Sequence, residues 1–526
     1  MSISNENKSS LVGSVSVVSG ATAFSRVLGL VREQVMAFFF GAGLATDAFL
    51  TAFRIPNLLR DMFAEGALSA AFVPVFKEKM VKESDAEAFR LADIVITAIL
   101  LVVGFIVLLG IIASPVIVYI SAHGFTAIPE KFDLTVDLTR VMFVYLLLVS
   151  LSALVMGMLN SFGKFGIPAL SPALFNLGII VTVVVLHRYL DTPVYSLAFG
   201  VLLGGVAQLL IQLPPLLKIG FRFKLSCNFL DEGLKRVVRL LTPMIIGLSA
   251  GRINILVNTL LASFLMQGSI SFLSYAYRLM HFPLGVFAVA LGTVALPAVS
   301  AMVARNDMNG LKRTFDEAIS LNLFVVVPSA FFLAMMGREV VDLIYTWGAF
   351  SAADSANTSL ALLHYSYGLV GFAAVRVIVP FFYAFNDSKL PMKASVASVV
   401  VNMALYYPFI QILNFAGLAA ATSIAGLLNV AILLYYLPSR GVTFSLGRLG
   451  LGLFRVSAAA LLAFYVGRLV PIRFYAGDSL LSARIENLLL PSIVAGLIYI
   501  LLCVLMGVGE VDLLIRKLIG KTAGRR

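Results

Sequence analysis

About fourteen apolar stretches, each long enough to cross a lipid bilayer, dominate this 526-residue chain. A membrane-spanning helix needs about 20 mostly apolar residues to cross the hydrocarbon core. The stretches fall near residues 12–39, 46–75, 91–120, 134–160, 168–187, 194–217, 240–266, 270–302, 317–346, 357–385, 391–413, 416–437, 449–470 and 486–508. Sixty per cent of the residues are hydrophobic and only 13% are charged, whereas soluble domains are about 45–50% apolar and about 25% charged. The sequence therefore predicts an all-α polytopic membrane protein.

Lysine and arginine are concentrated in the loops on one side of the predicted spans. Four basic residues lie in 77–90, six in 218–239 and three in 305–313, and the C-terminal tail adds five between 516 and 526. Because basic loops are retained on the cytoplasmic side, both termini are expected in the cytoplasm. The net charge of +12 is largely this asymmetry. Nucleic-acid binding needs a basic patch on a folded face, so no nucleic-acid partner is expected.

Two segments of the chain resemble each other. Residues 53–74 and 277–297 each contain an aromatic residue followed by arginine, a nearby proline, a run of small residues and a second proline about twenty residues on. Shared membrane composition is an alternative source of this similarity. Parallel repeats with an even number of helices form two bundles that move about a central site. We therefore expect six-helix lobes at 1–220 and 221–440 in a pseudo-two-fold arrangement, with two further helices and a basic tail at 441–526.

Several predicted spans contain arginine. A charge at the bilayer centre costs roughly 2.5–3.5 kcal/mol on insertion scales, so such groups normally face a protein interior or an aqueous cavity. The arginines within spans are Arg26, Arg32, Arg54, Arg60, Arg252, Arg278, Arg376 and Arg455, and lysine is scarce there. A guanidinium stays charged and holds phosphate through two parallel hydrogen bonds. The set therefore predicts an anionic, phosphorylated ligand.

These arginines also have a purely structural alternative, which is to hold helices together by pairing with carboxylates. The carboxylates within the same spans are Glu33, Asp47, Asp61 and Glu65. At least six arginines against four carboxylates leave positive charge over, which favours an anion site for the group. Arg455 is expected only to extend toward an interface.

The sequence contains no recognisable catalytic constellation. Cys227 and Cys503 are far apart and lack the spacing of a disulfide framework or a zinc site. The four histidines are scattered along the chain. We therefore expect neither enzyme activity nor a bound cofactor. A multidrug or amphiphile exporter stays open as an alternative, although such a protein would not need many arginines directed at one phosphate group.

Five segments of the chain resemble the MurJ/MviN family of lipid II flippases. They are SRVLGLVRE (25–33), FGAGLATDAF (40–49), FRIPNLLRDMFAEGALSAAFVPVF (53–76), ASFLMQGSISFLSYAYRLMHFPLGVFAVALGTVALP (262–297) and FYAFNDSKLPMK (382–393). The resemblance implies a fold of the multidrug/oligosaccharidyl-lipid/polysaccharide exporter superfamily, with two C-terminal helices that help to form a groove for a lipid tail. It also implies a substrate, lipid II (undecaprenyl-pyrophosphoryl disaccharide-pentapeptide), which is moved to the outer leaflet of the bacterial inner membrane for peptidoglycan synthesis. Membrane lipids and the cell-wall synthesis and division proteins are the implied partners.

The resemblance also implies which residues are functional. Positions that the family treats as functional are matched by Ser25, Arg26, Arg32, Asp47, Arg60, Glu65, Ser271 and Arg278. Glu33 stands where aspartate is common, and Asp61 stands where some members have arginine, which reverses the charge there. Tyr277 and His281 flank Arg278 where some relatives have acids, so Arg278 is expected to be less neutralised. His281 either responds to pH near its reference pKa of about 6.5 or is a plain hydrogen-bonded helix residue.

The residues and the resemblance lead to one expected mechanism. Substrate binding is assigned to Arg26, Arg32, Arg278, Ser25, Ser271, Arg60, Arg54 and Arg252, and gating ion pairs to Glu33, Asp47, Glu65 and Asp61. A ligand favours closure only by the difference between its affinities for the two states, so arginines contributed by both lobes are the useful contacts. Asp387 resembles a position that contributes to a sodium site in some relatives, and a helix cap or turn is its alternative role. Coupling to sodium or protons stays open.

Overall fold

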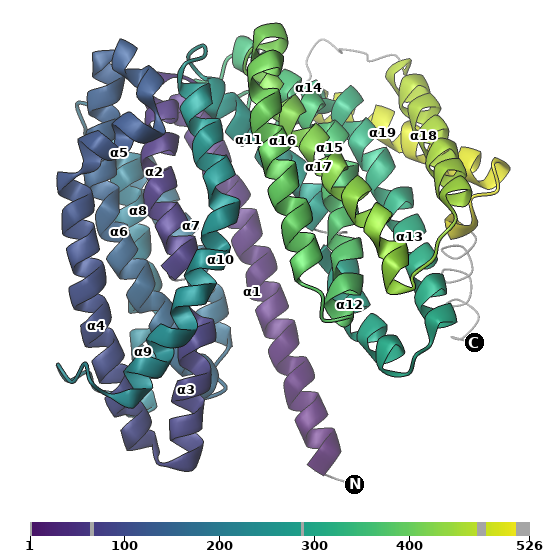
Figure 1. Cartoon of the computed structure of the whole chain (residues 1–526). Coiled ribbons are helices and arrows are strands. Elements are labelled where there is room, and N and C mark those ends of the chain that lie inside the picture. The colour runs from purple at the N-terminus through teal and green to yellow at the C-terminus, as the bar shows by residue number, and fades with distance from the viewer. Residues whose placement is uncertain (1–2, 64–67, 286–288, 471–479, 512–526) are drawn as a thin grey trace. The chain divides into compact units, whose positions relative to one another are not determined.

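The computed structural model describes residues 3–63, 68–285, 289–470 and 480–511, and helices account for most of them (Figure 1). Up to residue 263 these are α1 (Ile3–Phe40), α2 (Leu44–Phe63), α3 (Ser69–Lys82), α4 (Asp85–Ile112), α5 (Ser114–Ser121), η2 (His123–Ala127), α6 (Pro129–Ser161), α7 (Gly166–Leu186), α8 (Tyr195–Leu210), α9 (Leu213–Lys218) and α10 (Glu232–Ser263). The later helices are α11 (Ser269–Pro283), α12 (Val289–Ala304), α13 (Met308–Met335), α14 (Gly337–Ile344), α15 (Ala352–Ala384), α16 (Lys389–Leu413), α17 (Ala416–Tyr436), η4 (Leu437–Arg440), α18 (Leu446–Arg468) and α19 (Leu480–Leu505). No strand occurs among the described residues. The all-α prediction is confirmed.

Each predicted span corresponds to one helix or to two consecutive helices. Among the described residues, ten helices are long and apolar enough by themselves to cross a membrane, so the chain is a multi-pass membrane protein. Some spans are divided, as where α4 ends before α5 and α8 ends before α9. Both α5 and α9 have proline in their first turn. Proline is tolerated there because the first N–H groups of a helix have no intrahelical partner, whereas it disrupts a helix interior.

The lengths of the helices repeat along the chain. The third predicted span is a 28-residue helix, α4, followed by the eight-residue α5. Six spans later, α13 and α14 again have 28 and eight residues. The helices that follow, α6 and α15, have 33 residues each. Shared composition does not require equal lengths and equal breaks, so this correspondence supports the predicted internal repeat.

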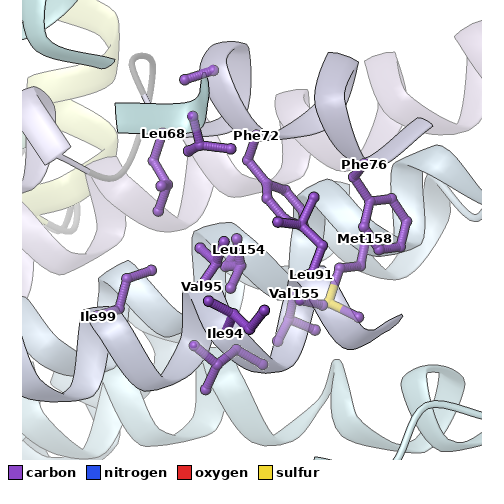
Figure 2. Close-up of a cluster of buried hydrophobic side chains, with 14 of the residues drawn as sticks. Leu68, Phe72, Phe76, Leu91, Ile94, Val95, Ile99, Leu154, Val155 and Met158 are labelled. Atoms are coloured by element: carbon purple, nitrogen blue, oxygen red, sulfur yellow. The ribbon is translucent and has the colours of Figure 1, made fainter. Parts of the chain in front are cut away.

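The helices divide into two compact units. Unit 1 comprises Met1–Ser271 with Gly348–Phe350, and unit 2 comprises Phe272–Trp347 with Ser351–Arg526. The predicted lobes, which divide at 220 and 440, follow the sequence repeat instead of contact density and stay a prediction. In unit 1, α3, α4 and α6 pack around a shared apolar core, in which Phe72, Phe76 and Leu91 are at most 1% exposed (Figure 2).

Glycine lets two helices of unit 1 approach closely. A Cβ atom on Gly178 of α7 would lie 2.5 Å from Cα of Gly204 on α8, and a Cβ atom on Gly204 would lie 2.6 Å from the carbonyl oxygen of Phe175. Such contacts are shorter than any side chain tolerates. Small residues at helix interfaces are common in membranes, where close backbone packing drives helix association. The α7–α8 pair is therefore fixed by the absence of side chains at these positions.

Unit 2 contains a core between α13, α15, α16 and α17 and a second one where α18 and α19 pack against α13. The C-terminal pair is also joined to the end of α14. Arg484 of α19 donates hydrogen bonds to the carbonyl oxygens of Asp342, at 2.9 Å, and Thr346, at 2.5 Å. Its guanidinium lies 4.1 Å from the ring centroid of Trp347, the one tryptophan of the chain. A cation–π contact and two hydrogen bonds thus hold α19 to the last turn of α14 and to the residues that follow it.

Candidate functional site

Asp47, in the first turn of α2, is the centre of a buried polar cluster in unit 1. Its carboxylate accepts hydrogen bonds from Lys131 Nζ at 2.8 Å, from the Gly268 N–H at 2.8 Å, and from the N–H and hydroxyl of Ser271 at 2.9 and 2.6 Å. The Lys131 and Asp47 side chains are only 4% and 2% exposed. A buried charge is tolerated when it is paired and hydrogen-bonded. Asp47 is therefore paired with a lysine, and Ser271 is its hydroxyl partner.

Lys131 is the member of this cluster that the sequence patterns did not indicate as a site residue. It lies in the first turn of α6, where the helix dipole disfavours a positive charge. Its ammonium group lies 4.1 Å from the ring centroid of Phe125, in η2. The ion pair with Asp47 and this cation–π contact offset the unfavourable position. One feature of the sequence does point to Lys131. It is a basic residue on the side of the membrane where the loops otherwise contain few basic residues.

Backbone contacts attach two further segments of unit 1 beside this cluster. The Gly124 N–H donates to Ser263 Oγ at 3.0 Å, and the backbone of Ser263 occupies the space that a side chain on Gly124 would need. The Ala349 N–H donates to the carbonyl oxygen of Phe38 at 2.8 Å. Gly348, with φ +61°, passes close to the same carbonyl. Residues 263–271 and 348–350 are thereby held to α1, α2 and η2.

The predicted substrate-binding arginines of unit 1 differ in their surroundings. Arg26 of α1 is exposed. Arg32, whose side chain is 15% exposed, donates to the buried carboxylate of Glu33 at 2.6 Å. Arg54 of α2 donates to the hydroxyl of Thr259 on α10, so it also joins two helices. Pairing of an arginine with a carboxylate is the structural alternative that the sequence left open for arginines within the spans, and Arg32 with Glu33 is an example.

Other predicted residues of unit 1 are less fully defined. Ser25 accepts a hydrogen bond from Asn176 Nδ2 through its backbone carbonyl at 3.1 Å. Arg60 is half-buried near the end of α2. Asp61 and Arg252 lie on α2 and α10, but their side chains fall outside the described set. Glu65 lies outside the described residues.

Arg278 is the predicted substrate-binding arginine of unit 2, on α11. Its side chain and that of Tyr277 are exposed. The Tyr277 and His281 rings are 4.0 Å apart between centroids, and His281 Nδ1 lies 3.0 Å from the Tyr277 carbonyl oxygen. Arg278 and Arg376, on α15, both lie close enough to His281 for electrostatic interaction. This part of unit 2 is therefore positively charged. The six predicted substrate-binding arginines occupy α1, α2, α10 and α11, which are the first two spans of each set of six.

Asp387 lies between α15 and α16. Its Oδ1 accepts from the N–H groups of Lys389 and Leu390, each at 3.1 Å, and its Oδ2 accepts from Arg440 at 2.6 Å. Partial burial opposes ionisation, but these hydrogen bonds and the Arg440 charge outweigh it and lower the pKa of the Asp387 carboxyl. Hard cations need several oxygen ligands, and within the described ranges no group of three or more His, Cys, Asp or Glu side chains could hold a metal. The donors around Asp387 fit a helix cap with a guanidinium partner.

The chain is similar to known proteins in family, in sequence and in structure. Residues 36–485 match the family model described as lipid II flippase MurJ. A lipid II flippase MurJ from Burkholderia cenocepacia is 35% identical over 81% of this chain and 83% of its own length. A probable lipid II flippase MurJ from Vibrio cholerae is also 35% identical, over 81% and 82% of the two chains.

Solved structures give a consistent result. A lipid II flippase MurJ in an inward closed conformation has a TM-score of 0.78 and 26% identity, covering 95% of this chain and 99% of its own. An inward-facing multidrug resistance transporter of the MATE family has a TM-score of 0.62 at 15% identity, covering 82% and 98%. That second likeness is one of fold alone.

Proposed function

This chain belongs to the MurJ family of lipid II flippases, and we propose that it moves lipid II from the inner to the outer leaflet of the bacterial cytoplasmic membrane by alternating access. The observation that carries the proposal is the family match over residues 36–485, which begins near the end of α1 and ends in the first turns of α19. The arginine-rich spans supply a physical reason for it. A pyrophosphate group needs charge compensation within the bilayer, and guanidinium groups provide that with paired hydrogen bonds.

Arg26, Arg32 and Arg278 are proposed to bind the pyrophosphate of the substrate. Arg26 and Arg278 are exposed, as a group that receives a ligand must be. Arg32 is shared with Glu33, so substrate phosphate would compete with that carboxylate for its guanidinium. Because a ligand shifts an equilibrium only by its differential affinity, such an exchange of partners is one way in which binding could favour one transport state.

The Asp47 cluster is proposed to act in gating. Through one carboxylate it joins α2 and α6 to the first turn of α11. Movement of Ser271 away from Asp47 would leave a buried ion pair with fewer hydrogen bonds, which is unfavourable. The cluster would therefore stabilise the state that the structure describes. In the other transport state, its charged groups would need water or new hydrogen-bond partners.

Energy coupling stays a proposal. The hydrogen bonds of Asp387 give no support to a sodium ion at this residue, so no transport step is derived through it. The charged side chains within the spans are compatible with transport that is coupled to protons or to the membrane potential. We further propose that the protein lies in the inner membrane with both termini in the cytoplasm, that it is not an enzyme, and that its partners are membrane lipids and the cell-wall synthesis and division proteins.

A multidrug exporter of the same superfamily is the second candidate function, because the chain also shares its fold with a multidrug transporter. The two candidates differ in the charge of the ligand. Arginines within the spans suit a phosphate and repel the cationic compounds that many multidrug exporters carry. Because the sequence identity with that transporter is low, the likeness shows a shared fold and not a shared function.

Reconstituted vesicles can test the proposal. The purified full-length chain is placed in liposomes with labelled lipid II in one leaflet, and exposure of the label in the other leaflet is followed while sodium, proton and electrical gradients are imposed one at a time. Transport of lipid II, with no transport of a cationic dye under the same conditions, is expected. Dye transport without movement of lipid II would favour the exporter function.

A further inference from the structure

Unit 2 contains a cavity of about 520 Å³ between α12, α15 and α16. Small-molecule sites usually measure about 300–1,000 Å³. Along α15 the lining residues Arg376, Val379 and Tyr383 are spaced by three and four positions. The lining residues from Ser388, just before α16, to Ser395 within α16 have the same spacing. Residues with this spacing share one face of a helix. One face of each helix therefore turns toward the cavity.

Close packing of two helices positions the charged residue of the cavity. A Cβ atom on Gly292 of α12 would lie 2.7 Å from the carbonyl oxygen of Arg376 on α15. Only glycine leaves room for this approach. Arg376 lies eight residues before the end of α15 at Ala384, which places its Cα about 12 Å along the helix at 1.5 Å per residue. Its guanidinium is thus presented well inside a membrane-spanning helix.

Among the described residues, no carboxylate forms an ion pair with Arg376. Its side chain is exposed and makes no hydrogen bond or ion pair with another residue of the described part. Asp387, the acidic residue closest to it in sequence, is already engaged by Arg440 and by the first N–H groups of α16. Arg278, on α11, adds positive charge around His281. The field in this region favours an anion.

The remaining lining is mainly apolar, with hydroxyl groups near the connection of α15 and α16. Leu296, Val379 and Met392 supply hydrocarbon surface, and Tyr383 and Ser388 supply hydrogen-bond donors. Tyr383 is 47% exposed and Met392 is 59% exposed, so the cavity is open on one side. One guanidinium beside an apolar wall matches a ligand with a phosphate at one end and a hydrocarbon chain at the other.

We propose that the cavity between α12, α15 and α16 binds a lipid phosphate, with Arg376 holding the phosphate and the apolar wall holding the first part of the chain. The ligand chemistry is common to polyprenyl phosphates and to anionic phospholipids. A planar guanidinium suits phosphate through paired hydrogen bonds. The site lies wholly within unit 2 and does not depend on which lipid the protein transports.

Native mass spectrometry of the full-length protein in detergent can test the site with three lipids: undecaprenyl phosphate, phosphatidylglycerol and the uncharged undecaprenol. At least one of the two phosphate lipids is expected to bind more tightly than undecaprenol. Arg376→Gln is expected to weaken that binding roughly tenfold or more, as expected for loss of charge-assisted hydrogen bonds. Binding of undecaprenol should change little. The phosphate lipid that binds more tightly identifies the source of the ligand.

Two further variants complete the test. Ser395→Trp places an indole in the cavity and is expected to weaken the binding of all three lipids. Arg448→Gln removes an exposed arginine in the first turn of α18, outside the cavity, and is expected to leave every affinity unchanged. Equal affinities for the Arg376→Gln, Ser395→Trp and Arg448→Gln variants would overturn the proposal. Lipid II translocation by the wild-type protein is measured separately, so its absence would contradict the proposed function and not this site.

Discussion

Two carboxylates of this chain illustrate how much the surroundings of one residue determine its role. Asp47 is almost fully removed from solvent and is matched by one ammonium group, two N–H groups and one hydroxyl. Asp387, between α15 and α16, has a guanidinium partner, and its side chain is 12% exposed. Loss of the charge at Asp47 would leave the buried Lys131 ammonium group without its counter-ion. Arg440, the partner of Asp387, is 44% exposed and can be hydrated instead. The same substitution is therefore expected to have different costs at the two positions.

Asp47→Asn should lower the free energy of unfolding by about 3–5 kcal/mol, because removal of one partner leaves the other buried charge uncompensated. Lys131→Met should also destabilise the protein, and the double variant should lose less than the sum of the two single changes. Chemical unfolding in detergent micelles provides the measurement. Asp137→Asn is the matched control on α6, because Asp137 and Arg140 form an exposed pair at 3.0 Å that is worth about 0–1 kcal/mol. Equal effects of Asp47→Asn and Asp137→Asn would show that the buried pair contributes no more than an exposed one.

The stability that Asp387 contributes should depend on pH in one direction. Its pKa is lowered in the folded state, so its contribution is complete above the unfolded-state pKa of about 3.9 and is lost as the pH falls through the folded-state value. The difference in melting temperature between the wild-type protein and Asp387→Asn should stay constant from pH 7 to about pH 5 and shrink only below about pH 4. A difference that already disappears near pH 6 would contradict this assignment.

Helix packing in unit 1 depends on places where side chains are missing. Gly178 and Gly204 form the contact between α7 and α8, and each would clash with backbone atoms if it carried a Cβ. Gly104 of α4, in contrast, has nothing within 4 Å of its Cβ position. The three glycines have similar apolar surroundings in the sequence, but only the structure distinguishes their roles.

Gly204→Val should destabilise the α7–α8 pair by about 1–3 kcal/mol, the usual cost of overpacking. Gly104→Ala should be neutral or slightly stabilising, because alanine favours a helix by about 1 kcal/mol relative to glycine. Thermal unfolding of the two variants in the same detergent compares these effects. A melting temperature for Gly204→Val equal to that of Gly104→Ala would mean that the contact between the helices is looser than described.

The sequence predicts the spans better than it predicts the contacts between them. Fourteen spans were expected, and each is represented by a helix or a helix pair, because a run of apolar residues of membrane length is a local property. The breaks after α4 and α13 were not expected. The pair of Asp47 and Lys131 joins positions 84 residues apart, and no periodicity within one helix contains that information. The arginine positions were visible from the sequence, whereas their partners required the tertiary structure.

At the scale of the whole molecule, orientation in the membrane can be tested with the two native cysteines. Cys227 is exposed in the connection between α9 and α10, and Cys503 is buried. The connection belongs to the basic loops that are expected in the cytoplasm. A membrane-impermeant maleimide should therefore label the protein in inside-out vesicles and leave it unlabelled in intact spheroplasts. Cys227→Ser provides the control, and labelling of the wild-type protein in spheroplasts would reverse the proposed topology.

Transport should require arginines from both units. Arg32→Ala and Arg278→Ala are each expected to reduce lipid II translocation to background without loss of expression. Arg32→Ala should also lower the melting temperature, because it removes an ion-pair partner of the buried Glu33 carboxylate. Arg455→Ala, on α18, is the matched control and should transport normally, because this arginine is expected only to extend toward an interface. The vesicle assay with labelled lipid II gives the rates. Normal transport by either of the first two variants would remove that residue from the proposed binding site.

Trp347 is an intrinsic fluorescence probe at one known position in the molecule. Since the chain has one tryptophan and its ring lies beneath the Arg484 guanidinium, ultraviolet emission excited at the red edge comes from the α14–α19 junction alone. A spectral shift on adding a lipid would thus report separation of a cation from an indole at that junction, without a dye or an engineered label.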